Sequence, residues 1–230
     1  MAKPREDLDP RASGDRALRD FLRQAPTYGI EPSSLQVERI RTYVAELLRW
    51  NEKINLTAAK DPAEVLNRHV LDSLVPLAQL SGVRRILDVG PGGGFPGIPL
   101  KIFRPSLSVV LVEARRKKAA FNQHVVDRLG LDGIEVIWAR LGDEEIDQRF
   151  GRMPFDAIIT RAALSGTRIL ELAFRVLRPG GTILLMKGSL GGREREALQK
   201  GARNKGRSVV QVLPYCLPGS NRTRNLVVIR

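Results

Sequence analysis

The residues whose types and spacing are best suited to chemistry lie in the chain's main glycine-rich segment. An apolar run, Ile86–Val89, carries an acid near its end and leads into this segment, as a buried strand does before a cofactor-binding loop. Glycines let a ligand approach bare backbone, and the next helix start offers free N–H groups to a carboxylate or a phosphate. Gly92, Gly94 and Gly97 also fit the dinucleotide spacing G-x-G-x-x-G, which is a weak match. The loop therefore predicts a cofactor site without choosing the cofactor.

A second acidic residue, Glu113, closes the next apolar run about twenty residues beyond this loop. A carboxylate at this position can accept hydrogen bonds from both hydroxyls of an adenosyl ribose, which S-adenosylmethionine and NAD share. Alternatively, Glu113 caps the basic helix start Arg115–Lys118. The choice of cofactor has to come from the elements that position the loop.

From Arg84 onward, strand-like runs alternate with helix-like segments, which predicts a parallel, doubly wound α/β sheet. The expected strands are Arg84–Val89, Ser108–Glu113, Ile134–Ala139, Phe155–Thr160 and Thr182–Lys187, and the expected helices are Gly97–Phe103, Arg115–Leu129, Thr167–Leu177 and Arg193–Asn204. Ser208–Leu213 and Arg224–Arg230 follow without a helix between them and must pair antiparallel. A mostly parallel, seven-stranded sheet with an antiparallel terminal hairpin is the Rossmann-like architecture of class I methyltransferases rather than of dinucleotide domains.

The first third of the chain is predicted to be helical. Residues 1–32 are expected to form a loose arm with one short helix. Ser33 starts a helix that runs through Trp50, with Gln36 completing a capping box, and Asp61 starts another helix. These helices precede the strands, so they must form an extension of the sheet domain.

At 230 residues, the chain is long enough for one moderate domain with an appendage. We expect a helical extension over residues 1–80, packed on a cofactor-binding domain over residues 81–230.

The sequence shows no membrane-length apolar run and no signal-peptide core, which predicts a cytoplasmic protein with no membrane partner. One cysteine and two histidines exclude an internal disulfide and a cysteine-rich metal site, so no metal is expected.

The net charge of +13 is concentrated near the C-terminus, where ten Lys and Arg residues stand against two acids from Lys187 onward. Such a basic third favours a polyanionic partner, of which nucleic acid is the commonest. The alternative is a solubilising surface without a partner.

Five separated segments resemble one enzyme family. In chain order they are Trp50–Thr57, Arg68–Leu74, Asp88–Pro99, Thr160–Ala162 and Leu185–Gly188. Together they are similar to the small-subunit ribosomal RNA guanine-N7 methyltransferases, a family also called glucose-inhibited division protein B. The resemblance implies a class I fold with a helical N-terminal extension and S-adenosylmethionine as the methyl donor. It implies a guanine in the decoding region of small-subunit ribosomal RNA as the acceptor.

The resemblance also implies roles for individual residues. The glycine loop would border the cofactor, Glu113 would hold the ribose, the segment after the third strand would contact the adenine, and Arg161 would face the reaction centre. The full cofactor-binding set is Gly90, Gly92, Gly94, Phe95, Glu113, Arg140, Leu141, Gly142 and Arg161. The chain departs from the family at Gly142, where an acid is usual. Here the acids are displaced to Asp143, Glu144 and Glu145.

Absent motifs narrow the acceptor independently of the resemblance. Thr160–Ala163 stands where exocyclic-amine methyltransferases generally carry Asn/Asp-Pro-Pro-aromatic. Cys216 is expected to be a buried structural thiol rather than the nucleophile of a pyrimidine C5 enzyme. Guanine N7 needs neither device, since its lone pair is unprotonated at neutral pH and permits direct in-line displacement. Arg161 could orient the guanine by donating to its O6 or to a phosphate. Alternatively, Arg161 forms an ion pair with an acid such as Asp88 or Glu113 and holds the loop.

The RNA-binding candidates are His69, Lys117, Lys118 and Lys187, although a lone histidine such as His69 is equally expected to be a packing residue. A monomer is expected. Three alternatives stay open at this point: a nicotinamide-dependent dehydrogenase, a noncatalytic RNA-binding module, and a class I methyltransferase with another RNA acceptor.

Overall fold

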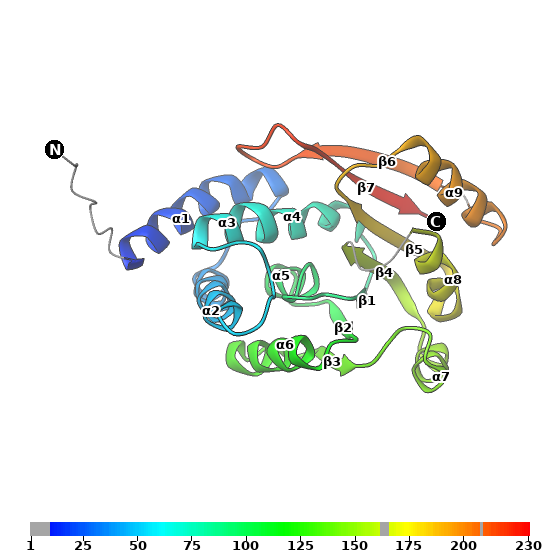
Figure 1. Ribbon diagram of the computed structural model, residues 1–230, viewed down its shortest axis with the longest axis horizontal. Helices are drawn as coiled ribbons and strands as arrows, with labels where there is room; N and C mark the ends of the chain where they lie inside the picture. The colour runs from blue at the N-terminus through cyan, green and yellow to red at the C-terminus, as the bar shows by residue number, and fades with distance from the viewer. Residues whose placement is uncertain (1–9, 162–165, 208) are drawn as a thin grey trace.

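A computed structural model describes residues 10–161, 166–207 and 209–230. Within these residues, seven strands form one sheet in the order β3-β2-β1-β4-β5-β7-β6 (Figure 1). The strands are β1 (Arg85–Val89), β2 (Ser108–Glu113), β3 (Ile134–Trp138), β4 (Phe155–Arg161), β5 (Leu177–Lys187), β6 (Val209–Cys216) and β7 (Thr223–Ile229). The pairs from β3 to β5 are parallel, whereas β7 pairs antiparallel with both β5 and β6. The predicted sheet and its terminal hairpin are confirmed.

Helices cover both faces of this sheet (Figure 1). Because side chains alternate along a strand, Ile86 and Leu111 enter one apolar cluster while Leu87 and Val112 enter another. The first cluster is completed by α1 (Pro10–Gln24), α2 (Ser34–Asn51), α3 (Pro62–Val65), α4 (Leu71–Leu74), α5 (Gly97–Phe103) and α6 (Arg116–Leu129). The second is completed by α7 (Glu144–Arg152), α8 (Gly166–Val176) and α9 (Gly192–Arg203). The N-terminal helices therefore share a core with one face of the sheet.

The predicted helix starts in the extension are confirmed by their caps. Gln36 N donates to Ser33 Oγ and Ser33 N donates to Gln36 Oε1, which closes the capping box of α2. Asp61 accepts from Glu64 N at the start of α3. The second helical stretch is not regular, because a π-helical segment, residues 66–70, separates α3 from α4 and a 3-10 segment follows.

The N-terminal arm was predicted to be loose with one short helix, and for residues 10–32 the helix is longer than expected and the arm is not loose. There, α1 spans 15 residues and packs its apolar side inward, with Phe21 only 1% exposed. The irregular spacing of apolar residues did not indicate the length of this helix or its packing, because only a few positions on it reach the core. Residues 1–9 lie outside the described part of the chain.

Three further differences concern the second half of the chain. The sequence patterns did not indicate α7, whose apolar contact comes from only Ile146 and Phe150, too few to show helical periodicity. Strand β5 begins at Leu177, ahead of the expected Thr182, because Leu177 pairs with Phe155 of β4 before a register shift. Cys216 is exposed at the end of β6, which corrects the expectation of a buried thiol.

No described helix is long and apolar enough to cross a membrane.

Candidate functional site

A pocket of about 820 Å³ opens at the carboxyl ends of β1, β2 and β4, where ligands bind in open α/β sheets. It brings together most of the predicted site residues: His69, Gly90, Gly92, Phe95, Glu113, Lys118, Arg140, Leu141, Gly142 and Arg161. Gly94, Lys117 and Lys187 do not line it. A separate, mainly apolar hollow of about 410 Å³ lies between α1, α2 and α3 and contains none of these residues. The larger pocket is therefore the candidate site.

The glycine loop forms the floor of this pocket. Gly90 and Gly92 adopt φ values of 69° and 60°, a left-handed conformation that favours glycine. Gly94, at φ 94°, lies behind the pocket wall, and a Cβ there would be 2.5 Å from Ile98 Cδ1. Gly94 thus serves close packing rather than direct contact with a ligand.

The buried carboxylate of Asp88 fixes the end of the loop. Its Oδ2 accepts a hydrogen bond of 2.7 Å from Gly97 N, at the start of α5. Burial raises the pKa of Asp88 well above its ordinary value. Asp88 does not contact Arg161 in the described structure, so its role is to join β1 to α5.

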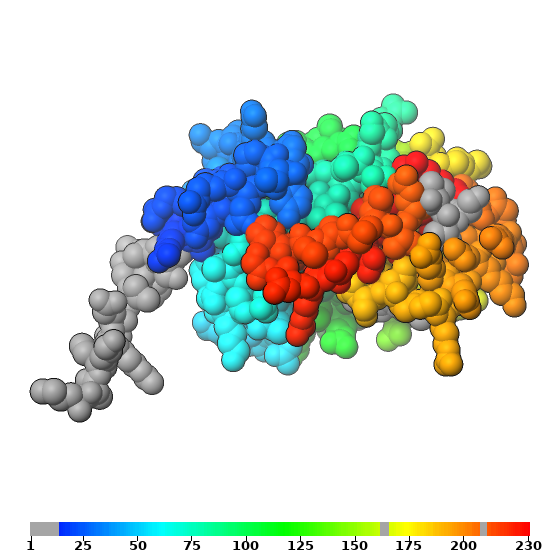
Figure 2. Space-filling model, turned by 90° about the horizontal axis from the view of Figure 1, so that it is seen from above, coloured from blue at the N-terminus to red at the C-terminus, as the bar shows by residue number. Residues whose placement is uncertain are grey.

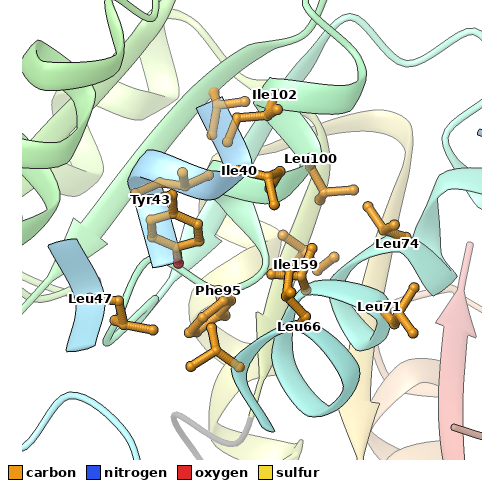
Figure 3. Packing of buried hydrophobic residues seen from close by; sticks show 14 of the residues in the cluster. Ile40, Tyr43, Leu47, Leu66, Leu71, Leu74, Phe95, Leu100, Ile102 and Ile159 are labelled. Atoms are coloured by element: carbon orange, nitrogen blue, oxygen red, sulfur yellow. The ribbon is translucent and has the colours of Figure 1, made fainter. Parts of the chain in front are cut away.

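The helical extension braces the same loop from behind. Tyr43, fully buried on α2, donates through its hydroxyl to Gly93 O at 2.5 Å. Its ring packs against Phe95 at a centroid distance of 5.5 Å, and Figure 3 shows the two rings close together. Tyr43 was not among the predicted site residues, although its spacing of three from Ile40 places it on the buried side of α2.

Glu113 lies at the end of β2, 5% exposed, and faces the loop. Its Oε2 accepts from Gly92 N at 3.0 Å, and its Oε1 accepts from Arg115 N at 2.9 Å. The capping role and the pocket role considered for Glu113 therefore coexist. Because a carboxylate has about four acceptor positions, Glu113 can still accept from ligand hydroxyls.

The segment after β3 forms the opposite wall. Asp143 Oδ2 accepts from Arg140 N at 3.0 Å, and Asp147 Oδ1 accepts from Gly142 N at 3.0 Å. Asp143 lines the pocket, so an acid stands one position beyond the expected one and holds the turn itself. Gly142 has φ 107°, and a Cβ there would lie 2.9 Å from Leu172, which explains why glycine fits at this point.

Arg161, at the end of β4, is held from several sides. Its Nε lies 3.0 Å from Oδ2 of the fully buried Asp72 on α4. Its Nη2 donates to His69 Nδ1 at 2.8 Å and to Arg68 O at 3.3 Å. The predicted alternative paired Arg161 with Asp88 or Glu113, and the structure corrects the partner to Asp72.

His69 joins this ion pair to the loop that precedes α3. Because the guanidinium of Arg161 can only donate, Nδ1 must accept, and Nε2–H of the neutral ring then donates to Thr57 Oγ1 at 2.6 Å. Burial, followed by the charge of Arg161, lowers the pKa of His69 to about 3. The ring also stacks on Phe95 at 4.9 Å. His69 is thus both a packing residue and a pocket residue.

Asp72 is a site residue that the sequence analysis did not single out. Besides Arg161, it accepts from Tyr215 at 2.7 Å and from Arg224 at 3.3 Å, both in the terminal hairpin. Burial and the Asp72 carboxylate raise the pKa of Tyr215, so its phenol stays a donor. Figure 2 shows the hairpin (orange and red) crossing this face beside α1. The available signal was the place of Asp72 in the segment Arg68–Leu74, one of the five that resemble the family.

The remaining basic candidates divide into two groups. Lys118 lines the pocket and Lys117 is exposed beside it on α6. Lys187 lies outside the pocket, and only 15% of its side chain is exposed. Its Nζ is 2.9 Å from Oε1 of Glu194 on α9.

Within the described residues, no group of His, Cys, Asp and Glu is arranged to hold a metal ion.

The strand order, the antiparallel last pair and the glycine-loop pocket with an acid at the end of β2 define a class I methyltransferase. Solved structures share this fold. An O-methyltransferase from Bacillus cereus in complex with SAH matches at a TM-score of 0.57 and 22% identity, covering 82% of this chain and 91% of that one. Precorrin-6y C5,15-methyltransferase from Geobacter metallireducens matches at a TM-score of 0.53 and 15% identity, covering 68% of this chain and 87% of that one. At these identities the likeness establishes the fold alone.

The family model for rRNA small subunit methyltransferase G (GidB) matches residues 36–226, and the chain belongs to this family. Two relatives carry the name ribosomal RNA small subunit methyltransferase G. The protein from Geobacter sp. (strain M21) is 37% identical, over 93% of this chain and 98% of its own length. The protein from Geobacter metallireducens is 38% identical, over 94% of this chain and 97% of its own length. The chain is an S-adenosylmethionine-dependent methyltransferase of small-subunit ribosomal RNA.

Proposed function

We propose that the acceptor is N7 of a guanine in the decoding region of small-subunit ribosomal RNA. The observation that carries this proposal is the position of Arg161 in the pocket formed by the glycine loop and Glu113. Asp72 and His69 hold two nitrogens of its guanidinium, whereas the buried Nη1 has no acceptor among the described residues. Arg161 is therefore a fixed cation with donor capacity left for a substrate oxygen.

The pocket fits S-adenosylmethionine. The buried Glu113 carboxylate can accept from ribose hydroxyls, and Gly90 and Gly92 present bare backbone beside it. Arg140 and Leu141 would border the adenine, while Phe95 closes the floor. When bound, S-adenosylmethionine supplies an electrophilic methyl group on a positively charged sulfur.

A ring nitrogen is the acceptor that these side chains suit best. Guanine N7 carries no proton, so the chain needs no residue to remove one. His69 could not easily serve as a base, because both of its nitrogens are engaged and its pKa is lowered to about 3. We propose that Arg161 donates to guanine O6 and leaves N7 free to face the cofactor. Alignment of N7 with the methyl group in this pocket then accounts for the rate.

We further propose that Lys117 and Lys118 contact RNA phosphates and that the chain acts as a monomer. Both lysines lie at or beside the pocket, where a backbone phosphate of a bound guanine would pass. Lys187, paired with Glu194, would support the site rather than contact RNA.

The test is to incubate the protein with methyl-labelled S-adenosylmethionine and small subunits from cells that lack this gene, and then to map 7-methylguanine by reduction and aniline cleavage. The proposal predicts one new cleavage in the decoding region. Label at another atom or nucleotide would contradict the proposed acceptor. Lys117→Ala, at the lysine that does not line the pocket, should weaken RNA binding with a smaller salt dependence, while cofactor binding stays unchanged.

A further inference from the structure

Trp138 is an exposed aromatic residue that neither the cofactor pocket nor the core uses. It ends β3, the edge strand of the sheet, and is 60% exposed. The other large apolar residues exposed among the described ones are Leu35 and Met153, and neither adjoins the pocket. Ala139 and Arg140, directly after Trp138, line the pocket. The indole therefore stands at the pocket's rim.

The indole is held in place from two directions. Its Nε1 donates to Ala114 O at 3.2 Å, which ties the ring to the segment after β2. The guanidinium carbon of Arg116 lies 5.4 Å from the ring centroid. In the parallel register, Trp138 pairs with Glu113, the residue that would hold the cofactor ribose. An aromatic ring fixed in this way loses little conformational entropy when a flat ligand stacks on it.

The surroundings of the ring are cationic. Arg115 and Lys117 flank Arg116 in the chain, Arg140 follows Trp138 by two positions, and all three are exposed. The acid nearest in sequence on β3, Glu135, is paired with Arg149 at 2.5 Å. An exposed aromatic face surrounded by cations is the combination with which proteins bind single-stranded nucleic acid, since the base stacks and the cations meet the phosphates.

We infer that Trp138 and Arg116 form a stacking platform for an unpaired base of the RNA substrate, next to the methylated guanine. This inference rests on the proposed function, because it names a second contact of the same RNA. The base stacks on the indole, and Arg116 neutralises the adjoining phosphate. The platform thus selects an unpaired strand and sets its direction across the pocket mouth.

The first test uses steady-state methylation of small subunits by Trp138→Ala, Trp138→Phe and Arg116→Ala. Trp138→Ala should raise KM for the subunit by about fivefold to about a hundredfold, the value of one base–aromatic stack. KM for S-adenosylmethionine and kcat should stay near wild type. Trp138→Phe should restore most of the affinity because it keeps an aromatic face. Met153→Ala, at an equally exposed apolar residue, is the matched control and should change nothing.

The second test uses fluorescence, which does not depend on catalysis. The chain has two tryptophans, and Trp50 packs against Phe121 and His124, so Trp138 is the exposed reporter. A purine-rich, unpaired oligoribonucleotide should quench the emission of wild type and not that of Trp138→Phe.

The outcomes separate this inference from the proposed function. If wild type methylates subunits but Trp138→Ala keeps the same KM for them, the platform is wrong. A rise in KM for S-adenosylmethionine alone would also overturn it, since the ring would then serve the cofactor. If wild type places no methyl on guanine N7 but its emission is quenched, the proposed acceptor fails while the platform stands.

Discussion

Asp72 and Arg161 form a buried ion pair of 3.0 Å that joins α4 of the helical extension to the end of β4. The same carboxylate accepts from Tyr215 and Arg224, so one side chain connects the extension, the central sheet and the terminal hairpin. The pair therefore ties the orientation of the guanidinium in the pocket to the assembly of three parts of the fold.

We predict that Asp72→Ala lowers the free energy of unfolding by about 3–5 kcal/mol, because it leaves Arg161 buried without its counter-charge. Asp72→Asn should cost less and still slow methyl transfer, since a neutral amide cannot hold two guanidinium groups equally well. Urea unfolding and single-turnover rates check these values. Tyr215→Phe is the matched control and should cost only about 1 kcal/mol. Equal rates for Asp72→Asn and wild type would remove Asp72 from the positioning of Arg161.

Arg161→Ala should abolish methyl transfer while the fold is retained, because Asp72 keeps Arg224 and Tyr215 as partners. Arg161→Lys should not rescue the rate, since a single ammonium cannot reach Asp72, His69 and a base together. Circular dichroism and calorimetry with S-adenosylmethionine establish that the variants are folded and bind the cofactor. Unchanged turnover in Arg161→Ala would exclude this residue from the mechanism.

Gly90→Leu should block cofactor binding, because Gly90 lines the pocket at a left-handed φ of 69°. Gly82→Leu is its control, with φ 71° and open space around the position where a Cβ would stand. Both variants carry the same backbone strain, but only Gly90→Leu places a side chain in the pocket. Calorimetry with S-adenosylmethionine separates the two effects, and equal affinity in both variants would show that the loop does not face the cofactor.

His69 should make stability depend on pH on the acid side. Its folded pKa of about 3 lies below the unfolded value of about 6.5, so the unfolded chain binds more protons between these two values. The free energy of unfolding should therefore rise with pH across this window by up to about 1.4 kcal/mol per unit from this residue, and become constant above it. Urea unfolding from pH 4.5 to 8 should show a smaller slope in His69→Gln. An identical slope would contradict the neutral assignment of the ring.

Tyr43→Phe should lower the free energy of unfolding by about 1 kcal/mol, because Gly93 O loses a buried donor. The affinity for S-adenosylmethionine should fall as well, since the brace behind the glycine loop is released. Thermal unfolding and calorimetry measure the two effects. If stability drops and the affinity does not, the extension stabilises the fold without organising the loop.

Local patterns were sufficient for the glycine loop, Glu113 and the order of strands and helices. Glycine spacing, an acid at the end of a strand and the alternation of apolar residues are properties of neighbouring residues. The terminal hairpin was predictable because no helix stands between its strands. Helix α7 was not, because only two of its apolar residues reach the core.

The sequence by itself determined the class I sheet, the cofactor loop and, through five motifs, the family. Only the tertiary structure decided the partners of the site residues. Arg161 meets His69 across 92 positions of the chain, and Arg224 meets Asp72 across 152. No local pattern specifies such pairs, because a buried carboxylate is satisfied by whichever donors the packed helices and strands bring to it. Packing of α2 against the sheet likewise placed Tyr43 behind the loop, where its hydroxyl meets Gly93 O across 50 positions of the chain.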